Sequence, residues 1–340
     1  MINRILIVGL GSIGLRHLRL ARQLFPEAEI KVLRHQQTRS VPEFADGCIT
    51  TITDALKFSP QVAVIANPAT YHLQTAQALA EAGIHLLIEK PLSHSIDNVE
   101  DLIKVKETKK IVIQVGYNLR FYPSLKVFRR FILDGVVGEI LFVNCEVGQY
   151  LPSWRPNSDY RTGVSAQKKL GGGVLLELSH EIDYINWIFG NIETVSSMFG
   201  KQSSLEIDVE DVAFMTLICA SESFRKKILV NLSMDFIRQD PIRICTAVGE
   251  NGTIRWNGIS GVVAVFKKGS SSWEPIFEIE SDRDESYIAE WKNFLNAIEG
   301  IEKSEVTIID AYNVLEIVTA ARESNLLGHR VKTKLLNAKV

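Results

Sequence analysis

The sequence predicts two domains of different class: an α/β domain with a doubly wound parallel sheet, then an α+β domain with a mostly antiparallel sheet. Its 340 residues exceed what one hydrophobic core usually organises. Up to about residue 120, short β-rich apolar runs alternate with helical patterns, which is typical of βαβ units. Beyond it, strand signals follow one another through turns, which is typical of an antiparallel sheet. We therefore predict domains at residues 1–120 and 121–340.

The apolar runs of the first domain are continuous rather than alternating, which indicates strands buried on both faces of a parallel sheet. They lie at Ile5–Val8, Ile30–Leu33, Val62–Ala66, Leu86–Ile88 and Ile111–Val115. Between two of them we expect a helix over Tyr71–Ala82, capped by Thr70 and ended by Gly83.

The second domain begins with a predicted helix from Pro123 to about Gly135. Its strands are expected at Ile140–Val147, Val212–Cys219, Lys227–Met234, Arg243–Gly249, Thr253–Trp256 and Val262–Lys267. Glu250-Asn251-Gly252 reads as a hairpin turn, since Asn-Gly readily adopts positive φ values. Three further helices are expected at Val174–Phe189, Tyr287–Ile298 and Ala311–Ser324.

The overall composition excludes several functional classes. Hydrophobic residues make up 46% and charged residues 23% of the chain, and its formal charge is −2, so neither nucleic acid nor an anionic membrane is a predicted partner. No apolar run approaches the ~18 residues that span a bilayer. The four cysteines form no CxxC pair, so we expect reduced thiols, a cytoplasmic location and no metal centre.

A glycine-rich loop follows the first predicted strand. Gly9-Leu10-Gly11-Ser12-Ile13-Gly14 lies between a strand and a helix, which is the context that a dinucleotide-binding loop requires. Gly9 permits the tight turn, Gly11 lets a pyrophosphate approach the backbone, and Gly14 allows close packing of the helix. We expect the backbone of Ser12 and Ile13 to take part in this binding.

The segment after the second strand bears on the choice of nucleotide. NAD-specific sites usually carry Asp or Glu there for the ribose 2′-hydroxyl. Here the sequence is Arg34-His35-Gln36-Gln37-Thr38-Arg39-Ser40, without a carboxylate. The guanidinium groups of Arg34 and Arg39 suit a 2′-phosphate, which favours NADP over NAD. The other interpretation is an ordinary solvated loop.

Further segments, taken in order, carry a family resemblance. They are Asn67-Pro68-Ala69-Thr70-Tyr71-His72, Glu89-Lys90-Pro91, Gly116-Tyr117-Asn118-Leu119-Arg120-Phe121, Gly171-Gly172-Gly173 and Glu177-Leu178-Ser179-His180-Glu181-Ile182-Asp183. With the glycine loop they resemble the glucose–fructose oxidoreductase, inositol dehydrogenase and rhizopine-catabolism family (Gfo/Idh/MocA). The resemblance implies a Rossmann domain, an open-faced antiparallel sheet and sugar-like substrates. It places Asn67, Pro68, His72, Glu89, Lys90 and Asn118 at the cofactor.

Lys90 is a candidate catalytic residue. It follows the carboxyl end of a parallel strand, where open α/β sheets place their ligands. A lysine there can donate a hydrogen bond to the reacting oxygen and stabilise its alkoxide character. The resemblance also implies a cis bond between Lys90 and Pro91.

His180 is the second candidate, because an imidazole that titrates near neutral pH can remove the hydroxyl proton as hydride leaves. Helical spacing would place Glu177, His180, Asp183, Tyr184 and Trp187 on one face. Relatives similar to inositol dehydrogenase carry an aspartate four residues before the histidine, where this chain has Leu176. Glu177 can serve instead, from a direction that differs by about a quarter of a turn.

The segment Tyr150–Arg161, which lies between the first domain and the glycine-rich start of a predicted helix, carries side chains suited to sugars. We expect the substrate to contact Arg120, Trp154, Arg155, Tyr160 and Asp183. Aromatic faces cover C–H surfaces, and the arginines can meet a carboxylate or diphosphate. A surface loop with packed aromatic side chains is the other interpretation.

Three functional hypotheses stay open at this point. The first is a dehydrogenase acting on a secondary alcohol of a sugar, sugar acid or nucleotide sugar. The second keeps its nucleotide bound and uses transient oxidation for epimerisation, elimination or glycoside cleavage. The third is a non-catalytic NADP-binding sensor, against which the presence of both Lys90 and His180 argues. We also expect a homodimer or homotetramer that uses the second domain's sheet.

Overall fold

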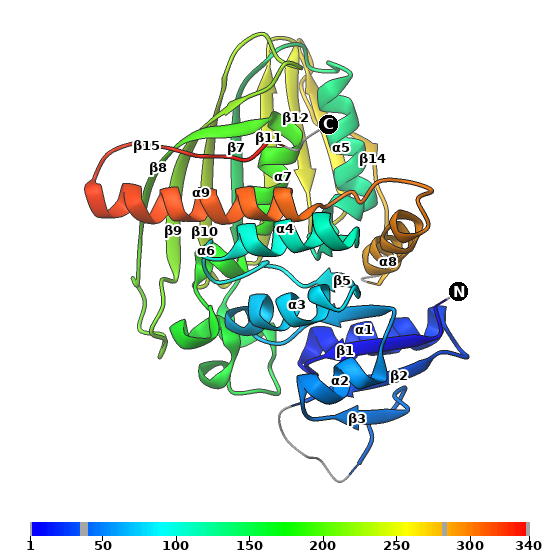
Figure 1. Ribbon diagram of the computed structural model, residues 1–340. Helices are drawn as coiled ribbons and strands as arrows, with labels where there is room; N and C mark the ends of the chain where they lie inside the picture. The colour runs from blue at the N-terminus through cyan, green and yellow to red at the C-terminus, as the bar shows by residue number, and fades with distance from the viewer. Residues whose placement is uncertain (1, 35–39, 281–283, 338–340) are drawn as a thin grey trace. The chain divides into compact units, whose positions relative to one another are not determined.

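The computed structural model describes residues 2–34, 40–280 and 284–337 (Figure 1). The chain divides into two compact units. Unit 1 comprises Met1–Tyr117 together with Glu290–Tyr312, and unit 2 comprises Asn118–Ala289 together with Asn313–Val340. Unit 1 is therefore assembled from two segments that lie far apart in the sequence.

Unit 1 contains a parallel sheet which, within the described residues, has the strand order β3-β2-β1-β4-β5-β6. Its strands are β1 (Arg4–Val8), β2 (Glu29–Leu33), β3 (Gly47–Ile49), β4 (Val62–Ile65), β5 (His85–Ile88) and β6 (Ile113–Val115). The doubly wound sheet is confirmed, and β3 is a strand that the sequence pattern missed. The order reverses between β1 and β4, where sheets of this kind place their ligands.

The helices of unit 1 connect these strands. They are α1 (Ser12–Leu24), α2 (Ile52–Phe58), α3 (His72–Glu81) and α4 (Val99–Lys109). Gly83 ends α3 as predicted, with a φ of 80°. The predicted cap at Thr70 is wrong, because the short 3-10 helix η1 (Ala69–Tyr71) precedes α3 and the Thr70 hydroxyl is buried without a hydrogen-bond partner.

Two long helices, α8 (Glu285–Ile298) and α9 (Ile308–Leu327), each contain a boundary between the units. The first residues of α8 belong to unit 2 and the rest to unit 1, and the first residues of α9 belong to unit 1 and the rest to unit 2. Within unit 1, Trp291 of α8 is fully buried and packs edge-on against Phe25, which follows α1. The C-terminal segment thus completes the core beneath α1. No helix in the described ranges combines the length and apolar character needed to cross a membrane.

The sheet of unit 2 has the order β14-β13-β12-β11-β7-β10-β9-β8-β15 among the residues described. Its strands are β7 (Ile140–Gly148), β8 (Asn191–Gly200), β9 (Val212–Ala220), β10 (Ile228–Asp235), β11 (Ile242–Gly249), β12 (Gly252–Asn257), β13 (Val262–Lys267), β14 (Glu274–Phe277) and β15 (Val331–Lys332). Neighbouring strands are antiparallel except β7 and β10. The mostly antiparallel sheet and its β11–β12 hairpin are confirmed, whereas β8, β14 and β15 had not been predicted.

Helices cover one face of this sheet: α5 (Pro123–Leu133), α6 (Val174–Glu177) and α7 (His180–Phe189) (Figure 1). Trp256 of β12 is buried on that face, where its indole N–H donates to the Ser124 hydroxyl at 2.9 Å. Several large apolar side chains of the strands are exposed instead, among them Met198 (75%), Phe214 (56%) and Leu229 (54%).

Candidate functional site

Three glycines shape the loop between β1 and α1. Gly9 has a φ of 87°, and a side chain on it would lie 2.7 Å from the backbone nitrogen of Asn67. A Cβ on Gly14 would lie 2.2 Å from the carbonyl oxygen of Gly9, so α1 packs directly on the loop. A Cβ on Gly11 would have no neighbour within 4 Å. The first and third glycines serve packing, and the second leaves the backbone open to a ligand.

The N-terminus of α1 opens at the same loop. The helix begins at Ser12, without a side-chain cap and without an acidic residue in its first turn. Its first N–H groups, including those of Ser12 and Ile13, have no acceptor within the helix. Together with the helix dipole, these donors favour an anion such as a pyrophosphate.

The segment after β4 is built around His72, whose ring is buried. Its Nε2 lies 2.6 Å from the carbonyl oxygen of Asn67, and its Nδ1 lies 3.0 Å from that of Pro91. Burial lowers the pKa of His72, and the two carbonyl oxygens oppose that shift. His72 thereby joins the loops after β4 and β5, while Pro68 leads into η1. The Oδ1 atom of Asn67 is buried and lacks a hydrogen-bond partner, so it can accept from a ligand hydroxyl.

Glu89 and Lys90 follow the carboxyl end of β5. The Glu89 carboxylate is buried, with Oε1 2.7 Å from His17 Nε2, and Oε2 accepts the backbone N–H of Lys90 at 3.1 Å. A Cβ on Gly116 would lie 3.0 Å from Oε2, so this glycine leaves room for the carboxylate. The peptide bond between Lys90 and Pro91 is cis, as the resemblance implies.

Arg34 directly follows β2, where its backbone N–H donates to the carbonyl oxygen of Ile49 at 2.9 Å. This bond holds the start of the predicted nucleotide-selecting segment against β3. The second predicted residue of that segment, Arg39, lies outside the described residues.

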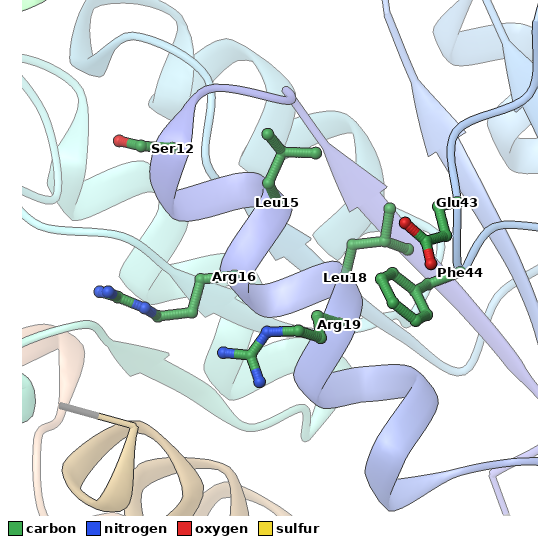
Figure 2. A pocket seen from close by; sticks show the side chains of 7 residues that line it. All are labelled: Ser12, Leu15, Arg16, Leu18, Arg19, Glu43 and Phe44. Carbon is green, nitrogen blue, oxygen red and sulfur yellow. The ribbon is translucent and has the colours of Figure 1, made fainter. Parts of the chain in front are cut away.

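A cavity of about 370 Å³ runs along α1 (Figure 2). Its lining residues are Ser12, Leu15, Arg16, Leu18, Arg19, Glu43 and Phe44. Arg16 and Arg19 extend from one side of the helix, whereas Glu43 and Phe44 lie beside Leu18 on the other. Among the described residues that the sequence predicts at the cofactor, Ser12 borders this cavity.

In unit 2, His180 is the first residue of α7. The sequence predicts one helix over Val174–Phe189, which is wrong: α6 ends at Glu177 and α7 starts three residues later. The Ser179 hydroxyl donates back to the carbonyl oxygen of Leu176 at 2.8 Å, which competes with regular helical bonding. Glu177 and His180 therefore do not share a face of one continuous helix, and the Glu177 carboxylate accepts the Ser165 hydroxyl at 2.7 Å.

Arg120 and Asp183 form a buried ion pair in unit 2. The Arg120 Nε and Nη2 atoms donate to the two carboxylate oxygens of Asp183 at 2.6–3.2 Å, and both side chains are at most 3% exposed. These two residues, predicted to meet the substrate, are thus directed at each other. Their neighbour Asn118 is also buried and donates to the Ser286 hydroxyl at 2.9 Å.

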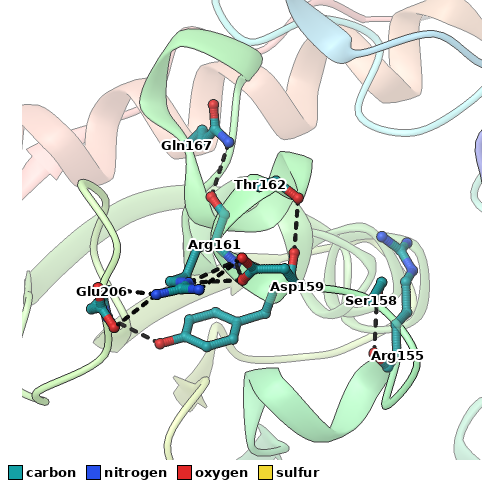
Figure 3. Close-up of polar contacts among 8 residues, drawn as sticks. Arg155, Ser158, Asp159, Arg161, Thr162, Gln167 and Glu206 are labelled. Atoms are coloured by element: carbon teal, nitrogen blue, oxygen red, sulfur yellow. Dashed lines mark hydrogen bonds and ion pairs between the residues drawn. The ribbon is translucent and has the colours of Figure 1, made fainter.

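The predicted substrate loop is held by its own polar contacts (Figure 3). The Arg161 guanidinium binds the Asp159 carboxylate at 2.9 Å and faces Glu206, and the Tyr160 hydroxyl accepts the backbone N–H of Glu206. The Trp154 indole N–H donates to the carbonyl oxygen of Gln149 at 3.1 Å. The Arg155 side chain is exposed, and in Figure 3 its guanidinium points away from this cluster.

Sequence reasoning missed two buried titratable residues of unit 1. His17, on the inner side of α1, and Glu290, on α8, lie beside Glu89. The spacing of His17 within the helix indicates only a core position, and Glu290 lies in a segment that appears ordinary in the sequence. Titratable side chains such as these are seldom fully buried, so the sequence alone does not predict their burial.

Two family models match this chain. Residues 3–117 match the NAD-binding Rossmann fold of an oxidoreductase family, and residues 129–333 match the C-terminal alpha/beta domain of the same family. The chain belongs to the Gfo/Idh/MocA family. The resemblance inferred from the ordered segments is thereby confirmed.

Individual family members resemble this chain at low sequence identity. An uncharacterized oxidoreductase, YrbE of Bacillus subtilis, is 27% identical over 224 residues, covering 62% of each chain. The first curated relatives are matched over 55–62% of their own length. A levoglucosan dehydrogenase in complex with NADH has a TM-score of 0.83 and 21% identity, covering 98% of this chain and 99% of that one.

A second similar structure is the WlbA dehydrogenase of Bordetella pertussis in complex with NADH and UDP-GlcNAcA. Its TM-score is 0.79 at 20% identity, covering 98% of this chain and 100% of that one. At these identities the two solved structures establish the family's fold for this chain.

Proposed function

We propose that this chain is an NAD(P)-dependent oxidoreductase that oxidises or reduces a secondary alcohol of a sugar, a sugar acid or a nucleotide sugar. The observation that carries the proposal is the combination, in unit 1, of open space at Gly11 with Lys90 at the carboxyl end of β5. One similar structure is named a levoglucosan dehydrogenase, and another is a dehydrogenase in complex with UDP-GlcNAcA. These names support a sugar or a nucleotide sugar as the substrate.

The residues of unit 1 fit a dinucleotide. The first N–H groups of α1 would hold its pyrophosphate, and the unpaired Oδ1 of Asn67 would accept a ribose hydroxyl. The nicotinamide, when bound, supplies the hydride acceptor or donor. We assign to the Lys90 ammonium a hydrogen bond to the reacting oxygen, which stabilises its alkoxide character.

Unit 2 would supply the base and the substrate contacts. We assign to His180 the removal of the hydroxyl proton in oxidation and its return in reduction. Glu177, held by Ser165, is the proposed orienting carboxylate. Trp154 and Tyr160 offer aromatic faces to a sugar ring, and the exposed Arg155 offers a guanidinium to an anionic group such as a carboxylate or diphosphate.

The proposal is tested by adding NADP or NAD to the purified protein with panels of sugars, sugar acids and nucleotide sugars. We expect one panel to raise absorbance at the reduced nicotinamide band. A protein that releases nucleotide on denaturation and shows no net reduction with any panel would instead use retained nucleotide for internal redox chemistry. A folded sample that binds neither nucleotide and releases none refutes the proposal.

On nucleotide choice, we propose a preference for NADP through Arg34, with Arg39 as a further contact. Arg34→Ala is expected to weaken NADPH binding by about 1–3 kcal/mol, a typical loss for a charged hydrogen bond, and to leave NADH nearly unaffected. Fluorescence titration with both reduced nucleotides measures this. Equal affinities in the unaltered protein would show that Arg34 belongs to an ordinary solvated loop.

We also propose a homodimer or homotetramer that covers the outer face of the second sheet. Phe214 and Leu229 are more than half exposed on neighbouring strands β9 and β10. Light scattering at micromolar concentration should give at least twice the mass of one chain, and Phe214→Lys should lower it. Leu326→Lys, which changes an exposed residue of α9, is the control. A monomeric unaltered protein contradicts the proposal.

A further inference from the structure

Three buried titratable side chains meet in unit 1: His17 of α1, Glu89 after β5 and Glu290 of α8. One nitrogen or oxygen atom of each lies within 4.8 Å of those of the other two. His17 and Glu290 have no exposed surface, and Glu89 is 6% exposed. A histidine and two carboxylates at this separation could hold a metal ion or share protons, and the hydrogen bonds decide between the two.

The position of the proton on His17 follows from Trp291. The indole N–H can only donate, and it lies 3.0 Å from His17 Nδ1, which must therefore accept. The ring proton is then on Nε2, 2.7 Å from Glu89 Oε1, so Nε2 is the donor to that carboxylate. A nitrogen that carries a proton has no lone pair for a metal ion. His17 thus acts as an anchor for Glu89 and not as a metal ligand.

The two carboxyl groups differ in their surroundings. Glu89 accepts N–H groups from the His17 ring and from the backbone of Lys90. Neither carboxyl oxygen of Glu290 has a hydrogen-bond partner, although its backbone carbonyl oxygen accepts the Gln114 amide at 3.0 Å. Burial, with the nearby negative charge of Glu89, raises the pKa of Glu290 well above its ordinary value. Among the described residues, His17 and Glu89 are the other titratable members of this cluster, each with a ligand atom within 4.8 Å of a Glu290 carboxyl oxygen.

We propose that Glu290 is a positioning residue: it remains a neutral carboxylic acid and leaves Glu89 as the single negative charge of the cluster, on which His17 and the Lys90 backbone are anchored. Ionised Glu290 would repel Glu89 across at most 4.8 Å of buried protein interior and loosen the attachment of Lys90. The inference for catalysis rests on the proposed function, in which Lys90 contacts the reacting oxygen. The protonation of Glu290 does not depend on it.

The first measurement is infrared difference spectroscopy of the full chain at pH 7 against Glu290→Gln, a neutral side chain of the same shape. We expect the unaltered protein to show the carbonyl stretch of a protonated carboxylic acid, which the variant lacks. Glu299→Gln removes an exposed carboxylate just after α8 and should leave the band in place. Absence of the band in the unaltered protein overturns the proposal, as does a stoichiometric metal ion whose removal lowers the Tm.

The second measurement is the Tm of each protein from pH 4 to pH 9. The unfolded chain loses the Glu290 proton near pH ~4.3, whereas the folded chain retains it to higher pH. The free energy of unfolding therefore falls as the pH rises from the pKa of Glu290 in the unfolded chain to its raised pKa in the folded chain. Glu290→Gln has no such proton to retain. We expect its Tm to exceed that of the unaltered protein by a margin that grows as the pH rises above ~4.3. Parallel Tm curves overturn the proposal.

Turnover then tests the positioning role. With a substrate identified by the panels, kcat should fall at alkaline pH as Glu290 ionises, and Glu290→Gln should move that fall to higher pH. If the infrared and Tm results hold but the two alkaline limbs coincide, Glu290 is a neutral acid without a positioning role, and the proposal is overturned. If those results hold and no turnover is found with any substrate, the proposed function fails while the protonation of Glu290 stands.

Discussion

Replacing Lys90 with methionine is expected to lower turnover by roughly 10²-fold or more while cofactor binding largely survives. Methionine keeps the approximate length of the side chain and removes the ammonium, so the alkoxide character that develops on the substrate oxygen loses its stabilising donor. Steady-state kcat on the identified substrate gives the loss, and fluorescence titration with reduced nucleotide gives the affinity.

Lys109→Met is the matched control, since Lys109 is an exposed lysine at the end of α4 in the same unit. It should leave kcat unchanged. His180→Ala should lower kcat comparably to Lys90→Met, and Glu177→Gln less if it only orients the histidine. Near-normal turnover in both Lys90→Met and His180→Ala would show that the catalytic assignment is wrong, even with the dinucleotide site intact.

Replacing Asp183 with alanine is expected to lower the free energy of unfolding by about 3–5 kcal/mol, because it removes the carboxylate that binds the buried Arg120 guanidinium through two of its nitrogen atoms. A residue that only touched substrate would instead change KM and leave stability nearly intact. Urea or guanidinium unfolding followed by circular dichroism measures the difference.

A double variant separates the charge from the packing. Arg120→Met combined with Asp183→Leu removes both charges. The free energy of unfolding lost in this double variant should be well below the sum of the losses in Arg120→Met alone and Asp183→Leu alone. Glu274→Ala, which breaks the exposed pair with Lys267 in the same unit, should have a much smaller effect. If Asp183→Ala raises KM and leaves the free energy of unfolding unchanged, Asp183 contacts the substrate and has no structural role.

Continuous apolar runs were enough to predict the central strands of unit 1, because burial on both faces leaves a local pattern in the sequence. Strand β8 was missed because Asn191–Gly200 includes an asparagine, a glutamate, a threonine and two serines, and the strand is defined by its pairing with β9 and β15. The break between α6 and α7 was missed for a different reason. The apolar spacing continues through it, while the Ser179 hydroxyl donates to the carbonyl oxygen of Leu176 and the backbone N–H of Glu181 bonds three residues back to Leu178.

The same distinction between local sequence pattern and long-range contact applies to the candidate site. The glycine loop and the cis Lys90–Pro91 segment are local features, so their residues can be recognised in the linear sequence. The pairing of Arg120 with Asp183 joins positions 63 apart, and the bond from Trp291 to His17 joins positions 274 apart. Such contacts depend on which elements the fold brings together, and no periodicity in the chain predicts them.

The discontinuous make-up of unit 1 has a consequence for how the protein is made. During synthesis Met1–Tyr117 leaves the ribosome first, yet its core lacks Trp291 until all of Asn118–Ala289 has been translated. Until then His17 has no indole donor, and Phe25 has no tryptophan to pack against. Nascent chains stalled before Glu290 should therefore present apolar surface to chaperones, and a fragment cut at Tyr117 should be prone to aggregate.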